Sequence, residues 1–274
     1  MPRALLRLKG RTAVVTGAAS GIGWGIALAL GRRGCHVALA DIDRAGLART
    51  TAEVSALGVR ASPHHLDVAD AAAVAAFPQR VAAEHPGVDV LVNNAGVALA
   101  GTFEQIAATD FDWLIAVNFF GVVRMTRAFL PLLHKSDDAR LVNISSLYGL
   151  IAPPGNTAYV ASKFAVRGFS ESLRHELAGS TVGVTVVHPG GVATSIARNA
   201  RLPANIDPVE ADVRRKAFEA LLRMPPEEAG EIVVRGAEHR RARVLVGADA
   251  KRVALIERLM PVNYWKLIGR SVHR

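Results

Sequence analysis

A tyrosine and a lysine four residues apart, Tyr159 and Lys163, have the spacing needed for acid–base chemistry. On a helix, residues four apart lie on one face, so the phenol and the ammonium can point at one site. A free phenol titrates near 10, but a cation at ~4 Å is worth about 4 kcal/mol at an effective dielectric constant of 20. Such an interaction lowers the phenol pKa by up to about three. The pair therefore predicts a tyrosine that acts as general acid–base near neutral pH.

A glycine-rich run, TGAASGIG, supplies a second chemical signal at residues 16–23. Gly17, Gly21 and Gly23 permit a tight turn and a close approach of the backbone to a phosphate. A helix that begins there offers free N–H groups and a favourable dipole to the same anion. This spacing is a variant of the dinucleotide-binding fingerprint, so the run predicts a pyrophosphate site.

Asp41 lies twenty residues after Gly21, where a carboxylate can accept hydrogen bonds from the adenosine ribose. The same carboxylate would repel the 2′-phosphate of NADP, and position 20 holds a serine rather than a basic residue. NAD is therefore the preferred cofactor and NADP the alternative. Arg44 favours NADP, whereas Asp43 beside it argues against it. The competing interpretation of Asp41 is an ordinary acid at the end of a strand.

These residues must be positioned by an alternation of short apolar runs and longer helical stretches. Runs rich in Val, Leu, Ile and Ala suit strands that are buried on both faces of a parallel sheet. Such alternation predicts an α/β fold, a single doubly wound Rossmann-type domain over residues 1–274 with a seven-stranded parallel sheet flanked by helices. The expected strands are Ala13–Thr16, His36–Ala40, Arg60–Leu66, Val88–Val92, Arg140–Ile144, Gly183–Val187 and Arg243–Val246. The expected helices include Ile22–Arg33, Ala45–Leu57, Ala71–Glu84 and Ala158–Leu177.

Polar motifs follow three of these strands. The segment 93–96 (NNAG) ends the fourth strand, 143–146 (NISS) the fifth and 188–190 (HPG) the sixth. Ligands of open α/β sheets bind beyond the carboxyl ends of the strands. All these motifs are therefore expected at one edge of the sheet, together with the glycine-rich turn.

With these motifs in this order, the chain resembles the short-chain dehydrogenases/reductases over about residues 10–247. The resemblance implies that Tyr159 donates or removes the alcohol proton and that Lys163 lowers its pKa and binds the nicotinamide ribose. It also implies that Ser146, rather than Ser145, orients the substrate oxygen. Asn118 would hold a water that links Lys163 to solvent. The implied reaction is hydride transfer between the nicotinamide and a secondary alcohol or ketone.

The same resemblance implies a set of cofactor contacts along the carboxyl edge of the sheet. Asp67 and Val68 would lie beside the adenine, and Thr194 would bind the carboxamide or the phosphate. The full set is Gly17, Ser20, Gly21, Ile22, Gly23, Asp41, Asp67, Val68, Asn94, Ala95, Gly96, Tyr159, Lys163, Pro189, Gly190, Val192 and Thr194.

Composition restricts the class of protein. The chain has 274 residues, a net charge of +9 and one cysteine, Cys35, so no intramolecular disulfide can form. Its N-terminal residues lack the pattern of a signal peptide, and no uncharged apolar stretch reaches the ~20 residues of a membrane span. We expect a cytoplasmic protein with no metal, since His64, His65 and Asp67 are better explained by surface or strand-end placement. Without a zinc-finger or RNP-type motif, nucleic-acid binding is not expected.

Residues 195–224 interrupt the alternation and are expected to form a substrate lid. An apolar pocket is predicted from Leu147, Leu150, Ile151, Leu202, Phe218, Leu221 and Leu222. It favours a hydrophobic, lipid- or steroid-like substrate, whereas Arg198, Arg201, Arg214 and Arg215 leave an anionic one open. Tyr148 either lines this pocket or only packs nearby, and His188 borders the cofactor site with no assigned role. The alternative functions are an NADP-dependent carbonyl reductase and a nucleotide sensor without catalysis.

Residues 248–274 extend beyond the resemblance as a C-terminal helical extension. Asp249 is expected to cap a helix over Lys251–Met260, with Val253, Ile256 and Met260 on one face. We expect this apolar face to pack on the protein itself near the lid, next on a partner subunit, and last on an anionic membrane as a peripheral contact. Members of the family usually associate through the helices of their fourth and fifth units. The extension favours a homodimer over a homotetramer.

Overall fold

The computed structural model describes residues 5–203, 206, 212, 215–216 and 219–272, with the side chains of 270–272 left aside. Within these residues, seven parallel strands form one sheet in the order β3-β2-β1-β4-β5-β6-β7. The strands are β1 (Thr12–Thr16), β2 (His36–Asp41), β3 (Ala61–His65), β4 (Val90–Asn93), β5 (Ala139–Ile144), β6 (Val182–Pro189) and β7 (Arg243–Val246). The predicted seven-stranded parallel sheet is confirmed.

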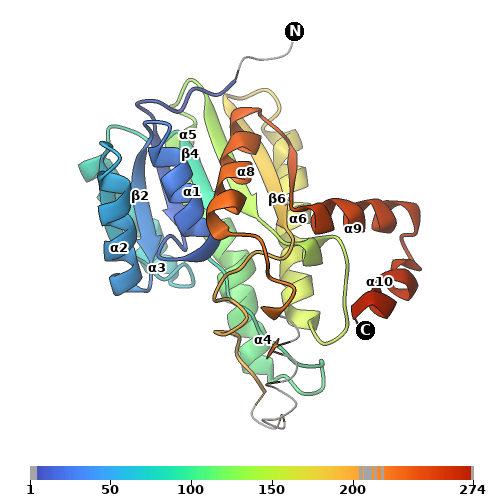
Figure 1. Cartoon of the computed structure of the whole chain (residues 1–274). Helices are drawn as coiled ribbons and strands as arrows, with labels where there is room; N and C mark the ends of the chain where they lie inside the picture. Colours follow the sequence, from blue (N-terminus) through green and yellow to red (C-terminus); the bar gives the residue numbers. More distant parts are fainter. Residues whose placement is uncertain (1–4, 204–205, 207–211, 213–214, 217–218, 273–274) are drawn as a thin grey trace.

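Helices cover both faces of the sheet (Figure 1). One layer holds α1, α2 and α8, and the other holds α3, α5 and α6, each with its own apolar cluster against the strands. The helices are α1 (Gly21–Gly31), α2 (Arg44–Ser55), α3 (Ala71–Glu84), α4 (Ala108–Ile115), the π-helical turn η1 (Ala116–Phe120), α5 (Gly121–Leu133), the 3₁₀ turn η2 (Leu147–Gly149), α6 (Thr157–Glu176), α8 (Pro226–Glu238), α9 (Ala248–Leu259) and α10 (Tyr264–Val272).

Local sequence accounts for where several of these elements begin. Every residue of β1 and of β5 is buried, as is expected for strands covered on both faces, although β5 includes the polar side chains of Arg140 and Asn143. The carboxylate of Asp43 accepts the Ala45 and Gly46 N–H groups at the start of α2, and Asp70 does the same for α3. These side chains satisfy helix N–H groups that have no partner within the helix.

The order of the strands has a switch point between β1 and β4. After β1 the chain adds β2 and then β3 on one side of β1, and it crosses back to add β4 on the other side. The loops after β1 and β4 are held together because the Thr16 hydroxyl oxygen accepts the N–H groups of Asn94 and Ala95, both at 3.0 Å. A crevice at such a switch point is where open α/β sheets bind ligands.

Helices α4, η1 and α5 form one long stretch, Ala108–Leu133, that could cross a bilayer by length and composition alone. A buried core helix passes the same test, and one face of this stretch is packed in the fold. Met125, Phe129 and Leu133 are buried against the sheet, and the ring of Phe129 lies 5.4 Å from that of Phe77 on α3, centroid to centroid. The apolar composition of that face is therefore explained by its contact with the sheet.

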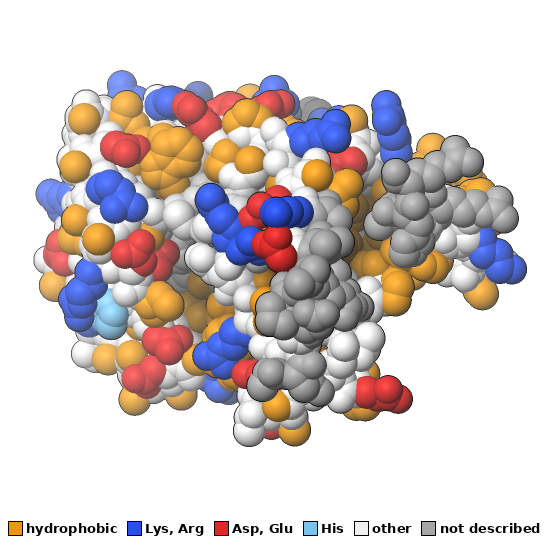
Figure 2. Space-filling view, turned by 60° about the horizontal axis from the view of Figure 1, so that its bottom comes forward, with side chains coloured by type: hydrophobic (Ala, Val, Ile, Leu, Met, Phe, Trp, Pro, Cys, Tyr) orange, Lys and Arg blue, Asp and Glu red, His pale blue; other side chains and the backbone are white. Residues whose placement is uncertain are grey.

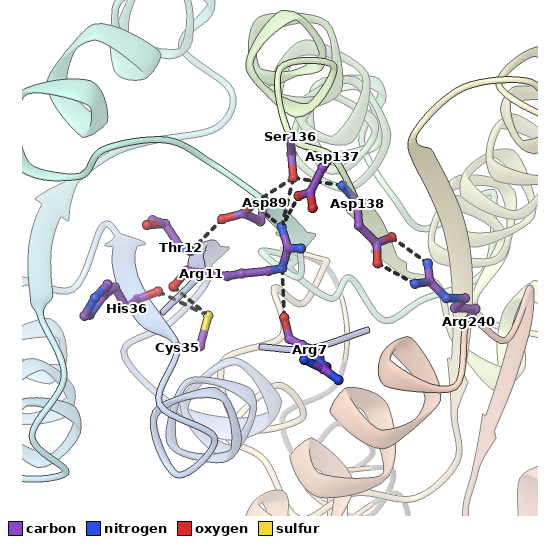
Figure 3. A network of polar contacts seen from close by, with 10 residues as sticks. All are labelled: Arg7, Arg11, Thr12, Cys35, His36, Asp89, Ser136, Asp137, Asp138 and Arg240. Atoms are coloured by element: carbon purple, nitrogen blue, oxygen red, sulfur yellow. Dashed lines mark hydrogen bonds and ion pairs between the residues drawn. The ribbon is translucent and has the colours of Figure 1, made fainter. Parts of the chain in front are cut away.

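An ion-pair network joins several elements at the amino-terminal edge of the sheet, opposite the crevice (Figure 3). Arg11 donates to Asp89 Oδ1 at 2.7 Å and to Asp137 Oδ1 at 2.9 Å, and Asp89 Oδ2 accepts the Thr12 N–H. The hydrogen bond from Arg11 lowers the pKa of the Asp137 carboxyl. The network ties the segment before β1 to the start of β4 and the end of α5.

The placement of His64 differs from the prediction. His65 is exposed, as expected, but His64 is buried on the opposite face of β3 and packs edge-on against Phe77. Burial lowers the pKa of His64 to about 4, and its Nε2 lies 2.8 Å from the Ser62 hydroxyl. The neutral ring can be buried because that hydroxyl satisfies its polar nitrogen. Among the described residues, no cluster of three His, Cys, Asp or Glu side chains could hold a metal ion.

Candidate active site

A cavity of about 1250 Å³ lies at the carboxyl edge of the sheet. It is lined by nearly all of the residues singled out from the sequence, from the turn after β1 to the loop after β6. Those in the lining are Gly17, Ser20, Gly21, Ile22, Asp41, Asp67, Val68, Asn94, Ala95, Gly96, Ser146, Tyr159, Lys163, Pro189, Gly190, Val192 and Thr194. Gly23 and Asn118 are buried behind this surface.

The glycine-rich turn fits closely under the start of α1. A Cβ on Gly23 would lie 2.0 Å from the Gly17 carbonyl oxygen, so only glycine lets the helix rest on the turn. Gly17 has φ of +65°, which an L side chain rarely adopts. Ser20, at the N-terminus of α1, makes no side-chain capping bond within the described part of the chain. The first N–H groups of α1 therefore remain available to an anion in the cavity.

Asp41, the last residue of β2, lines the cavity. Its Oδ2 accepts the Ala19 N–H and its Oδ1 accepts the Asp43 N–H, both at 2.9 Å, which orients the carboxylate beside the glycine-rich turn. Each oxygen retains a lone pair for a further donor. Arg49 also lines the cavity, whereas Arg44, the basic residue considered from the sequence, does not. Nothing in the local sequence distinguishes the two arginines, since their exposure depends on how α2 packs.

Three polar side chains converge at the other end of the cavity. The Ser146 hydroxyl, which follows β5, hydrogen-bonds to the Tyr159 phenol in the first turns of α6. Lys163 lies one turn further along the helix, with its Nζ 5.6 Å from the centre of the Tyr159 ring. That ammonium donates to the Ile144 carbonyl at 3.2 Å. The i and i+4 spacing thus brings the phenol and the cation to one site.

The two adjacent serines have different environments. The Ser145 hydroxyl donates to the Lys163 carbonyl at 2.8 Å and is buried under α6. Ser146 is only half-buried and accepts the Tyr148 N–H on its hydroxyl oxygen. Of the two, Ser146 is the one that contacts Tyr159.

The pKa of Tyr159 differs from the prediction. Burial raises it to about 12, and the hydrogen bond from Ser146 offsets only part of that effect. Burial also lowers the pKa of Lys163 to about 8. Lys163 is not among the groups that shift the phenol pKa, and its ammonium is bonded to the Ile144 carbonyl.

Asn118 lies in η1, a π-helical turn within the long α4–α5 stretch. Its Oδ1 accepts the Val97 N–H at 2.8 Å, and its Nδ2 donates to the Val97 carbonyl at 3.0 Å and to the Ser162 hydroxyl at 3.3 Å. A π-turn inside an α-helix is typical of functional sites. Here it ties the loop after β4 to α6, and the predicted water link to Lys163 stays a prediction.

Two residues near the catalytic group have contacts that the sequence did not reveal. His188 is fully buried, and its Nδ1 lies 2.9 Å from the Ser146 carbonyl oxygen, so the ring braces the backbone of that serine. Burial lowers its pKa to about 4. Tyr148 lines the cavity and packs edge-on against Tyr159, with ring centroids 6.0 Å apart. The position of His188 directly before Pro189 and Gly190 is the sequence feature that could have indicated its contact with Ser146.

Asp249 does not cap its helix, contrary to the prediction. Helix α9 begins at Ala248 with Gly247 as its N-cap, and the Asp249 carboxylate instead accepts the Gly191 N–H at 2.7 Å. A Cβ on Gly190 would lie 2.2 Å from that carboxylate. Glycine at position 190 therefore leaves room for the contact, and the C-terminal extension is joined to the loop that lines the cofactor end of the cavity.

The lid region confirms part of the predicted pocket and corrects the rest. Leu147, Leu221 and Leu222 line the cavity. Leu150 and Ile151, after η2, are instead buried in the fold, and Leu202 in the lid is 44% exposed; none of the three lines the cavity. Phe218 and Arg214 lie outside the described residues.

Two of the lid arginines, Arg201 and Arg215, form ion pairs, whereas Arg198 is exposed and has no ion pair within the described residues. Arg201 donates to Asp110 at 3.0 Å, and its guanidinium lies 3.4 Å from the centroid of the Trp113 ring. The backbone of Arg201 pairs with that of Ala98 and Ala100, which fastens the start of the lid across the cavity. Arg215 forms an ion pair with Asp212.

Known proteins are similar to this chain in sequence and in fold. The family model for short chain dehydrogenases matches residues 11–205. The oxidoreductase SadH of Mycobacterium tuberculosis is 44% identical over 269 residues, which cover 96% of each chain. The oxidoreductase UcpA of Salmonella typhimurium is 38% identical and covers 82% of this chain and 87% of its own.

Among solved structures, a short chain dehydrogenase/reductase from Burkholderia phymatum in complex with NAD superposes with a TM-score of 0.86 and 28% identity. It covers 93% of this chain and 95% of its own. A short-chain dehydrogenase from Streptomyces avermitilis gives a TM-score of 0.81 at 29% identity, covering 96% and 99%. From the matched length, the identities and the shared fold, the chain belongs to the short-chain dehydrogenase family of oxidoreductases.

Proposed function

We propose that the protein transfers a hydride between NAD and a hydrophobic secondary alcohol or ketone. The observation that carries this proposal is the cavity itself. Asp41 and the uncapped start of α1 line one end, and Ser146, Tyr159 and Lys163 line the other. A dinucleotide that spans the cavity would thus meet Asp41 at its ribose, the start of α1 at its phosphates and Tyr159 at its reactive end.

Ser146, Tyr159 and Lys163 have different roles at the reacting carbon. Ser146 holds the substrate oxygen, and Tyr159 removes the hydroxyl proton during oxidation or returns it during reduction. Lys163 binds the nicotinamide ribose and keeps a positive charge under the phenol. A bound oxidised nicotinamide would supply the hydride acceptor and a second positive charge near Tyr159. Tyr159, with its pKa raised by burial, needs that charge to work as a base near neutral pH.

The substrate end of the cavity supports an apolar substrate. Leu147, Leu221, Leu222, Tyr148 and Trp113 line it. Of the two lid arginines in the lining, Arg201 is paired with Asp110 and Arg223 donates to the Ala220 carbonyl. These contacts favour a hydrophobic alcohol or ketone over an anionic one. The test is a panel of alcohols and ketones with NAD(H) and NADP(H), followed by the absorbance of the reduced nicotinamide. Turnover only of anionic substrates would contradict the proposal.

The cofactor choice rests on Asp41. Replacing Asp41 with alanine is expected to raise KM for NAD about tenfold or more, because a charged hydrogen-bonding partner of the ribose is lost. The gap between NAD and NADP should narrow as well, because the mutation removes repulsion of the 2′-phosphate near Arg49. Steady-state KM values for both cofactors check this.

The matched control for Asp41 is Asp67→Ala, an exposed carboxylate in the same cavity further from the glycine-rich turn. It should change KM for NAD less and leave the preference for NAD intact. A wild-type enzyme that already prefers NADP would overturn the assignment of Asp41.

We also propose a homodimer, assembled through the long helices of the fourth and fifth units. Phe120 at the end of η1 is 47% exposed and Phe164 on α6 is 38% exposed, and apolar rings of this size favour burial in an interface. Phe120→Glu is expected to convert the dimer into a monomer, as measured by sedimentation equilibrium. Phe103→Glu, at a 67% exposed position outside these helices, is the control. A Phe120→Glu protein of unchanged mass would refute this interface.

A further inference from the structure

The C-terminal helices form an arm that projects from the body of the protein (Figure 1). For the arm, α9 and α10, we expected the face of Val253, Ile256 and Met260 to pack near the lid; Val253 and Ile256 are half-buried, and Met260 is 36% exposed. Among the described residues, two hydrogen bonds attach the arm to the body, one near its start and one after its turn. Asp249 accepts the Gly191 N–H, and the Tyr264 hydroxyl oxygen accepts the Ala152 N–H at 2.9 Å. Most of the length of the arm is consequently open to its surroundings.

Large apolar side chains remain exposed along the arm. Leu255 is 58% exposed and Leu259 72%, and their spacing of four places them on one face of α9. Val262 in the turn is 85% exposed, and Leu267 on α10 is 47% exposed. Burying a leucine is worth about 1.5–3 kcal/mol, so this face gains free energy when something apolar covers it.

Positive charge surrounds these apolar side chains. Lys251, Arg252 and Arg258 are exposed on α9, and Lys266 is exposed on α10. Within the described residues, none of these four cations forms an ion pair. The acids of this stretch are Asp249 and Glu257, and Asp249 is already bonded to Gly191. Figure 2 shows hydrophobic and basic side chains next to one another on the projecting arm.

We propose that the arm docks on the surface of an anionic lipid bilayer. Leucines interspersed with Lys and Arg on a short exposed helix suit the boundary between acyl chains and anionic headgroups. The arm of a second copy fits less well, because each arm carries Lys251, Arg252, Arg258 and Lys266 against Glu257, and two such arms would repel one another. Lysine is also depleted from the cores of protein–protein interfaces.

The attachment of the arm connects this surface to the cavity. Gly247, Ala248 and Asp249, where α9 begins, line the cavity together with Gly191. Ala152, bonded to Tyr264, lies between η2 and α6, the elements that follow Ser146 and carry Tyr159. A docked arm would therefore hold the cavity close to a bilayer, from which an apolar alcohol or ketone could enter. This part of the inference rests on the proposed function.

The test is co-sedimentation of the full-length protein with vesicles. Vesicles of phosphatidylcholine with phosphatidylglycerol are compared with vesicles of phosphatidylcholine alone, at low and at high salt. We expect binding to the anionic vesicles, weaker binding to the neutral ones, and a fall at high salt because exposed charges are screened. Equal binding to both vesicle types, or none to either, would overturn the proposal.

Two pairs of variants locate the contact. The double variant Leu255→Ser with Leu259→Ser is expected to reduce the partition coefficient at least tenfold, whereas Leu5→Ser, at a position 56% exposed on the N-terminal segment, should not. Arg258→Glu should weaken binding several-fold, and Lys135→Glu, an exposed lysine after α5, is its control. Turnover of a water-soluble alcohol should be unchanged in all four.

The same variants show whether a bilayer or a second copy of the chain covers the arm. If the double variant bound vesicles normally but had a smaller oligomeric mass in sedimentation equilibrium, a second copy would cover the arm and the proposal would be wrong. Vesicle binding is measured without turnover, so a protein that binds vesicles but oxidises no alcohol would contradict only the proposed function.

Discussion

Replacing Tyr159 with phenylalanine is expected to lower kcat by about 10²–10⁴-fold, the range that general acid–base catalysis contributes. Phenylalanine keeps the ring that packs against Tyr148 and over Lys163 but cannot carry a proton. Cofactor affinity should stay within a few-fold, because the remaining cavity contacts are preserved. Single-turnover rates and NADH fluorescence titration separate the two effects.

Tyr148→Phe is the matched control, since it removes a hydroxyl from the same cavity at a ring 6.0 Å from Tyr159. It should leave kcat within about tenfold. The pH profile provides a further check. Oxidation requires the deprotonated phenol, so in the wild type kcat/KM for oxidation should rise with pH until the phenol pKa in the cofactor complex is reached, and Tyr159→Phe should lose this rise. Near wild-type rates in Tyr159→Phe would rule out the proposed mechanism and favour another proton carrier.

The second large effect is expected at the crossing of α1 and α8. A Cβ on Gly25 would lie 2.2 Å from the Pro226 carbonyl oxygen, and one on Gly230 would lie 2.2 Å from the Gly25 carbonyl carbon. The two backbones are therefore in direct contact, and neither can yield as a flexible side chain would. Gly25→Ala is expected to lower the free energy of unfolding by about 3 kcal/mol or more, because overpacking forces the helices apart.

The control is Gly168→Ala, in the exposed middle of α6, where an added Cβ meets nothing within 4 Å. Alanine there should stabilise the protein by up to about 1 kcal/mol through helix propensity. Both variants gain that propensity, so the difference between them isolates the contact between α1 and α8. Urea denaturation and the Tm measure it. A Gly25→Ala protein as stable as Gly168→Ala would show that the helices separate at little cost.

Much of the fold and most of the residues around the cavity were predictable from the chain alone. Buried parallel strands are rich in apolar residues, as Ala13–Val15 of β1 shows. Parallel strands also bring their carboxyl ends to one edge, so Asp41, Asn94 and Ser146 could be placed in one cavity by counting strands. These predictions succeed because each depends on local composition together with one rule of topology.

Other features required the packed structure. Arg49, rather than Arg44, reaches the cavity because of how α2 lies on the sheet. His64 is buried because β3 turns that face toward α3. The high pKa of Tyr159 reflects the desolvation of its hydroxyl by the surrounding chain, which the spacing to Lys163 does not reveal.

The sequence by itself determined the parallel sheet, the glycine-rich turn and the Tyr159–Lys163 spacing. The tertiary structure decided which surfaces those elements leave uncovered. The apolar pattern of α9 predicted an amphipathic helix, yet only the packing shows that Leu255 and Leu259 face outward on a projecting arm. The physical reason is that periodicity records which residues share a face, whereas burial depends on what distant segments bring against that face.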